Sequence, residues 1–134
     1  MSETTTPNTT LEIFKEEYKS LLRRCERDAD KYTLKMNEDY EYFFRWYADK
    51  MYVAQLNLKA VRELRPMIYW DDTEKIKTWL ENHISNIERT LIEGSQLPSS
   101  TSMMMNAAEV LKRVAMQELR QELQRLQMVL TYNK

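Results

Sequence analysis

Residues 11–65 read LEIFKEEYKSLLRRCERDADKYTLKMNEDYEYFFRWYADKMYVAQLNLKAVRELR, and the order of the apolar residues in this stretch indicates how the chain folds. Apolar side chains recur at steps of three and four that average about 3.6 residues, the period of one helix face. The stripe consists of Leu11, Phe14, Tyr18, Leu21, Cys25, Ala29, Tyr32, Met36, Tyr40, Phe43, Tyr47, Met51, Ala54, Leu58 and Val61. We expect the helix to end at Arg65–Pro66, because proline disfavours helix in the residue before it.

Two arrangements of this stretch stay open. One continuous, coiled-coil-like helix from 10 to 65 would be about 80 Å long, far above the usual helix length. A break near Asn37 would instead give helices over 10–36 and 38–65, with Asn37 as the cap of the second helix. The continuous arrangement leaves residues 11–36 protruding, with an exposed apolar stripe that needs a partner. The broken one lets the chain fold back on itself.

The pattern continues beyond Pro66. A short connector over 66–71 leads to a helix over 72–93, whose start carries a capping box of Asp71 and Glu74. This helix ends before the chain's only glycine, at a position where a left-handed residue is favoured. Ser102 is a suitable N-cap for a last helix over 103–131.

These elements predict an all-α fold, a bundle of three or four long amphipathic helices. We expect one helical domain over 10–134, preceded by a flexible polar tail over 1–9. The chain has 134 residues, one glycine and three prolines, and this scarcity of turn residues disfavours sheets.

The composition also limits the environment of the protein. Formal net charge is −1, so no overall cationic field attracts nucleic acid or anionic lipid. The single cysteine excludes an internal disulfide, and no apolar stretch approaches the roughly 18 residues of a membrane span. The N-terminus lacks the apolar core of a secretory signal. We therefore expect a soluble, intracellular, cytoplasmic protein that does not associate with membranes.

Residues for catalysis are scarce. His83 is the only histidine, which excludes Cys/His zinc clusters and paired Glu-x-x-His metal sites, and we interpret it as a partly exposed helix residue. Cys25 lies on the apolar stripe, where a buried structural thiol is the simpler interpretation. A single glycine cannot build a phosphate-binding loop. We therefore expect no catalytic, metal-binding or cofactor-binding residues, no small-molecule substrate and no enzyme activity.

A row of basic residues carries an alternative hypothesis. Lys15, Lys19, Arg23, Arg27, Lys31 and Lys35 follow one another at an unbroken spacing of four. Such a row is a candidate track for phosphates, and it suggests a nucleic-acid-associated regulatory protein. Residues 11–36 hold seven basic and six acidic side chains, however, so the local net charge is only +1. A solvated helix face is therefore the preferred interpretation of the row.

An aromatic cluster carries the preferred hypothesis. Seven aromatic side chains crowd residues 40–52 and point in all directions around a helix. Tyrosine and tryptophan are favoured in protein interfaces, although a helix at the centre of a bundle shows the same pattern. We predict a non-catalytic protein–protein interaction module that binds another protein or itself as a homo-oligomer. The candidate contact residues are Leu21, Tyr40, Tyr42, Trp46 and Tyr47.

Overall fold

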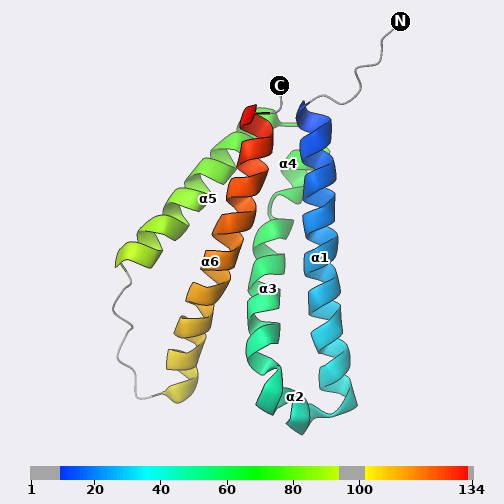
Figure 1. Ribbon diagram of the computed structural model, residues 1–134, viewed down its shortest axis with the longest axis vertical. Coiled ribbons are helices and arrows are strands. Elements are labelled where there is room, and N and C mark those ends of the chain that lie inside the picture. The colour runs from blue at the N-terminus through cyan, green and yellow to red at the C-terminus, as the bar shows by residue number, and fades with distance from the viewer. Residues whose placement is uncertain (1–9, 94–101, 133–134) are drawn as a thin grey trace, which may run out of the picture.

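The structure, a computed structural model, describes residues 10–93 and 102–132, and all the regular elements in these ranges are helices (Figure 1). They are α1 (Thr10–Glu38), α2 (Tyr40–Trp46), α3 (Ala48–Arg62), α4 (Arg65–Tyr69), α5 (Thr73–Glu93) and α6 (Met103–Tyr132). The predicted all-α class is confirmed. The expected helices over 72–93 and 103–131 agree with α5 and α6 to within one residue at each end.

The first long segment is broken, and the break lies at Asp39. This residue has an extended backbone (φ −157°, ψ 98°), and its carboxylate accepts a hydrogen bond from the Tyr42 N–H at 3.1 Å. Asp39 is therefore the N-cap of α2, and the cap lies two residues later than the Asn37 position inferred from sequence. The carboxylate thus satisfies one of the free N–H groups in the first turn of α2, and the break needs neither glycine nor proline.

The expected helix over 38–65 is divided into α2, α3 and α4. A second interruption falls at Tyr47 (φ −130°, ψ −7°), although its N–H still bonds the Phe43 carbonyl at 2.7 Å. Pro66 lies in the first turn of α4, where its missing N–H costs nothing, so part of the expected connector over 66–71 is a short helix.

The start of α5 differs by one residue from the sequence interpretation. The Asp72 carboxylate accepts from the Lys75 N–H at 3.1 Å, so Asp72 caps the helix, whereas Asp71 adopts a positive φ of 55°. The predicted Ser102 cap is confirmed, because its hydroxyl accepts from the Met105 N–H at 3.2 Å. The N-terminal segment 1–9 and the glycine after α5 lie outside the described residues.

The long helices lie side by side (Figure 1). Helix α1 runs antiparallel to α3, and α6 lies against both of them. Helix α5 makes its main contacts with α6 and α4. Helix α6 is therefore the shared neighbour of α1, α3 and α5. The turn formed by α2 lies at one end of the molecule, and α4 and the end of α6 lie at the other (Figure 1).

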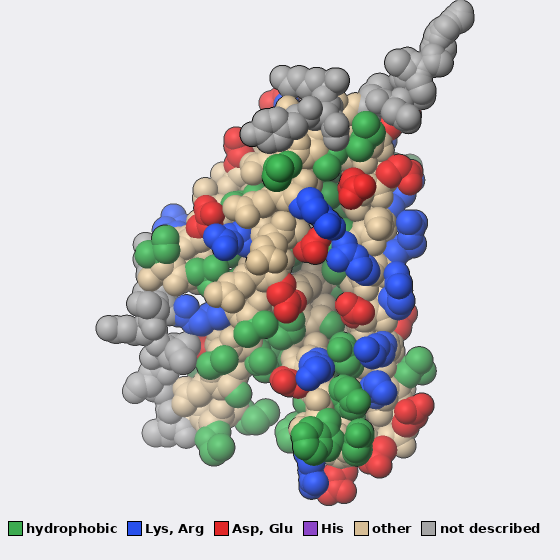
Figure 2. All heavy atoms as spheres, viewed as in Figure 1, with side chains coloured by type: hydrophobic (Ala, Val, Ile, Leu, Met, Phe, Trp, Pro, Cys, Tyr) green, Lys and Arg blue, Asp and Glu red, His purple; other side chains and the backbone are tan. Residues whose placement is uncertain are grey.

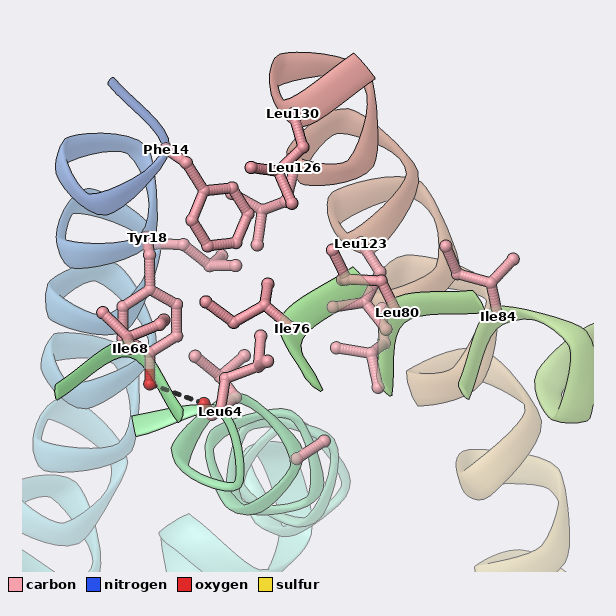
Figure 3. Packing of buried hydrophobic residues seen from close by; sticks show 14 of the residues in the cluster. Phe14, Tyr18, Leu64, Ile68, Ile76, Leu80, Ile84, Leu123, Leu126 and Leu130 are labelled. Carbon is pink, nitrogen blue, oxygen red and sulfur yellow. Dashed lines mark hydrogen bonds between the residues drawn. The ribbon is translucent and has the colours of Figure 1, made fainter. Parts of the chain in front are cut away.

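The main hydrophobic core is concentrated at the α4 end. Side chains from α1, the end of α3, α4, α5 and α6 converge there with Leu64, which lies just before α4 (Figure 3). Phe14, Leu64, Ile76, Leu80 and Leu123 are completely buried. Burying one such side chain stabilises the fold by roughly 1.5–3 kcal/mol, so this cluster dominates the favourable packing energy.

One buried hydrogen bond ties α1 to the end of α3. The Tyr18 hydroxyl donates to the Val61 carbonyl at 2.7 Å, and Figure 3 shows this bond beneath the core. Burial raises the pKa of Tyr18 to about 12, so the phenol stays protonated and remains a donor at neutral pH. The bond fixes the register between the first and third helices.

Within residues 10–93 and 102–132, none of the helices combines the length and apolar character that spanning a membrane requires.

Candidate functional site

Large exposed apolar side chains gather on α2. Tyr40, Tyr42, Phe44 and Trp46, which we call the α2 surface, are each 53–64% exposed, whereas Phe43 between them is only 4% exposed. Figure 2 shows hydrophobic side chains clustered over this end of the molecule. Helix α2 is therefore anchored through one face and presents aromatic rings on the others.

Local contacts hold the α2 surface in place. The Asp39 cap fixes the start of the helix, and Phe43 is buried beneath it. Ring contacts connect the α2 surface to its neighbours: Tyr42 and Tyr47 have centroids 6.1 Å apart, and so do Tyr47 and Tyr32 of α1. The exposed rings thus project from a short helix whose position is fixed at both ends.

A groove of about 360 Å³ lies beside the first turns of α3, between α1, α3 and α6. Its lining residues are Asp28, Tyr32, Asp49, Lys50, Val53, Ala54, Asn57, Leu111, Val114 and Glu118. A second hollow of about 220 Å³ shares Asp28, Asn57 and Glu118 with the first. The two hollows are therefore parts of one groove that follows α3, and we call it the α3 groove.

The polar side chains of the α3 groove are mainly acidic. Asp28, Asp49 and Glu118 line its first part, and Lys50 is the only basic residue there. The Asn57 side-chain amide donates to Glu118 at 3.2 Å. Its Oδ1 is buried and has no hydrogen-bond partner within the described residues. The α3 groove thus holds excess negative charge and one unsatisfied acceptor.

The first half of α6 borders the same end of the molecule. Met103, Met104, Met105, Val110 and Val114 are exposed. The buried residues of this helix begin at Ala115 and continue to its last turns. In Figure 2 the start of α6 and the turn at α2 are separated by a notch at the lower edge. The apolar stripe of α6 is therefore covered in its second half and open in its first.

The structure separates the predicted contact residues into two groups. Tyr40, Tyr42 and Trp46 are exposed and belong to the α2 surface, and Tyr47 is partly buried beside them. Leu21 is only 3% exposed and lies in the core, because α1 packs against α3 and α6. The apolar stripe of residues 11–36 is therefore occupied by contacts within the chain, and Leu21 has no free face for a partner.

Most of the basic row is engaged within the chain. Lys15 pairs with Asp71, and Lys19 lies 3.8 Å from Glu16. The Lys31 and Lys35 ammonium groups lie 5.2 and 4.8 Å from the ring centroids of two tyrosines, Tyr32 and Tyr47. Within the described part of the chain, the side chains of Arg23 and Arg27 make no ion pair. Figure 2 shows Lys and Arg side chains along α1, at the right edge of this face.

His83 and Cys25 are both partly buried. His83 stacks on Trp79 with centroids 4.3 Å apart, and burial lowers its pKa, which favours the neutral ring. Burial raises the pKa of Cys25 to about 11, so its thiol stays protonated at neutral pH and is a poor nucleophile. In the ranges that the structure describes, no group of three or more His, Cys, Asp or Glu could hold a metal ion.

Sequence reasoning did not single out the α3 groove. Asn57 precedes the buried Leu58 and belongs to no recognisable motif, and Glu118 lies on another helix 61 residues later. Asp28 appeared only as one of several acidic residues that neutralise the basic row. No periodic signal connects such positions, because their proximity depends on how α1, α3 and α6 pack.

The arrangement therefore offers an aromatic surface, an adjoining acidic groove and an open helix start at one end of the molecule. Comparison with known proteins finds no matching family model, no similar curated protein and no similar solved structure. The functional inference consequently rests on the geometry of this chain alone.

Proposed function

We propose that this protein is a non-catalytic helical interaction module, an adaptor, assembly factor or structural subunit that binds another protein through the α2 surface. Its four longer helical segments would act as a bundle that supports this surface. The observation that carries the proposal is the exposure of Tyr40, Tyr42, Phe44 and Trp46 on one seven-residue helix.

The area of the α2 surface supports this role. A large aromatic side chain buries about 150–250 Å² when covered, so four rings that are more than half exposed present roughly 300–500 Å². Tyr40 and Phe44 lie on one flank of α2, and Tyr42 and Trp46 lie on the other, so this area is divided between two apolar patches. Exposed apolar patches often mark binding sites. Tyrosine and tryptophan are also the side chains whose burial contributes most to binding at interface centres.

The fixed position of α2 supports it further. Binding is weakened when loops or side chains must be ordered at the interface. Helix α2 already has its N-cap from Asp39 and its buried anchor at Phe43. Covering its rings would therefore require little rearrangement of the backbone.

The proposal is tested by affinity capture from an extract of the source cells, with the tagged full chain as bait. The double variant Phe44→Ser/Trp46→Ser removes two exposed rings of the α2 surface. The control variant Trp70→Ser removes a ring that is 75% exposed at the opposite end of the molecule. Each bait is first checked for unchanged helical circular dichroism and unfolding midpoint.

We expect the wild type and Trp70→Ser to retain the same proteins and the double variant to lose them. A set of captured proteins that is identical for all three baits would contradict the proposal. So would a wild-type bait that retains nothing.

A further inference from the structure

We propose that the α3 groove receives an amphipathic helix of the partner protein, with apolar side chains in the groove and Lys or Arg side chains at its acidic rim. This inference rests on the proposed function and adds the chemical class of the partner. It is carried by the acidic residues at the rim of the groove and by its apolar lining.

The acidic residues of the groove, which we call its rim, favour a cationic occupant. Asp28, Asp49 and Glu118 face one basic residue, Lys50, in the first part of the groove. The second part adds Glu122 and Arg24, which neutralise one another through an ion pair at 3.3 Å. In the described residues the Asp28 carboxylate has no ion pair, so an arriving cation displaces no internal partner there. Unlike charges across an interface favour association, and like charges oppose it.

The lining of the groove selects an amphipathic occupant. Val53 and Ala54 from α3 and Leu111 and Val114 from α6 form apolar walls between the acidic residues. Val114 is 39% exposed and Leu111 is partly buried, so both retain apolar surface that a partner can cover. A helix with apolar residues on one stripe and cations on its flanks matches this alternation.

The length of the groove fits a short helix. Along α3 the lining runs from Asp49 to Val61, which spans about 18 Å at 1.5 Å per residue. A partner helix of about 12 residues has this length. The ring contacts from Tyr32 through Tyr47 to Tyr42 link the start of the groove to the α2 surface. One partner can therefore contact both.

The test uses two fluorescein-labelled peptides of 14 residues with the same helical pattern of leucines. The polar positions are lysine in one peptide and glutamate in the other. Fluorescence anisotropy with the full chain measures the Kd of each peptide at 50 and 300 mM salt. We expect the Leu/Lys peptide to bind at 50 mM salt and to weaken at 300 mM as the charges are screened, and the Leu/Glu peptide not to bind.

Two variants distinguish binding in the groove from attraction by the overall charge of the protein. Asp28→Asn/Glu118→Gln neutralises two rim carboxylates and retains an acceptor for the Asn57 amide. Glu17→Gln/Glu81→Gln removes the same charge at two exposed positions outside the groove lining. We expect the first variant to bind the Leu/Lys peptide about fivefold or more weakly, and the second to change the Kd less than twofold.

Equal weakening by the two variants would overturn the inference, because it would indicate attraction by net charge alone. Equal binding of the two peptides, or binding of neither, would overturn it as well. The proposed function fails separately, because the capture of a natural partner by the α2 surface depends on Phe44 and Trp46 and makes no demand on the partner's charge.

Discussion

The two ends of this molecule carry apolar side chains in different states. At the α4 end, Phe14, Leu64 and Leu123 are completely buried in a core to which α1, α3, α4, α5 and α6 contribute. At the α2 end, Phe44 and Trp46 are more than half exposed. Phe14 lies on the apolar stripe of residues 11–65, whereas Phe44 and Trp46 lie off this stripe, on other faces of α2. The difference shows that helical periodicity marks the face that packs inward, while the neighbouring helices determine whether apolar residues on the other faces are covered.

The difference follows from the paths of the helices. Helices α4 and α5 begin at the packed end, where α1 also begins and α6 finishes (Figure 1). Toward α2 the first twelve residues of α6 contain no buried side chain, and the α3 groove lies between α6 and its neighbours. Fewer helices therefore cover the apolar residues at the α2 end.

The largest expected effect distinguishes the two ends by stability. Phe14→Ala removes a completely buried ring and leaves a cavity, so we expect it to lower the free energy of unfolding by roughly 3–5 kcal/mol. The matched variant Phe44→Ala removes the same ring from an exposed site and should change that free energy by less than about 0.5 kcal/mol. Equilibrium denaturation in urea measures both.

An equal loss in the free energy of unfolding for the two variants would contradict the difference between the two ends, because it would indicate that Phe44 is buried in a core. If Phe14→Ala left the free energy of unfolding unchanged, Phe14 would not belong to the core at the α4 end.

A smaller effect concerns the side of the core where α5 faces α3. His83 is partly buried, and a hollow of about 150 Å³ lies between it, Leu56 and Met116. Burial holds its folded-state pKa below the ordinary value of 6.5, so the unfolded chain takes up a proton more readily below that pH. The stabilising contribution is present above about pH 6.5 and is lost as the pH falls below it.

We therefore expect the wild type to lose more stability than His83→Gln when the pH falls from 7.5 to 5. Thermal unfolding of both proteins across this range measures the difference, and the acidic groups common to both cancel. If the unfolding temperatures of the two proteins changed in parallel with pH, His83 would be fully hydrated and α5 would lie farther from α3 than the structure places it.

Much of the fold could be predicted from the sequence, because helical periodicity and capping chemistry are local. Fourteen of the fifteen stripe residues between 11 and 65 are partly or completely buried, and Tyr40 alone among them is exposed. The Ser102 cap follows from one hydroxyl and its position. The sequence predicted caps at Asn37 and Asp71, whereas the observed caps are Asp39 and Asp72. Asn and Asp side chains close together in the sequence are equivalent as caps, so the pattern cannot choose between them.

The candidate site was only partly predictable. The aromatic crowding of residues 40–52 drew attention to Tyr40, Tyr42 and Trp46, but periodicity could not distinguish these exposed rings from the buried Phe43. Leu21 is buried in the core, and the sequence alone does not reveal that α1 packs against α3 and α6. The acidic groove requires residues of three helices, and only their packing brings these together.

The most direct test of the central claim is photo-crosslinking of the full chain in an extract of the source cells. A benzophenone amino acid replaces Trp46 in one protein and Trp70, at the opposite end, in another. We expect a discrete crosslinked protein from position 46 and none from position 70. Crosslinking from position 70 alone, or from neither position, would contradict the assignment of the α2 end as the interaction surface.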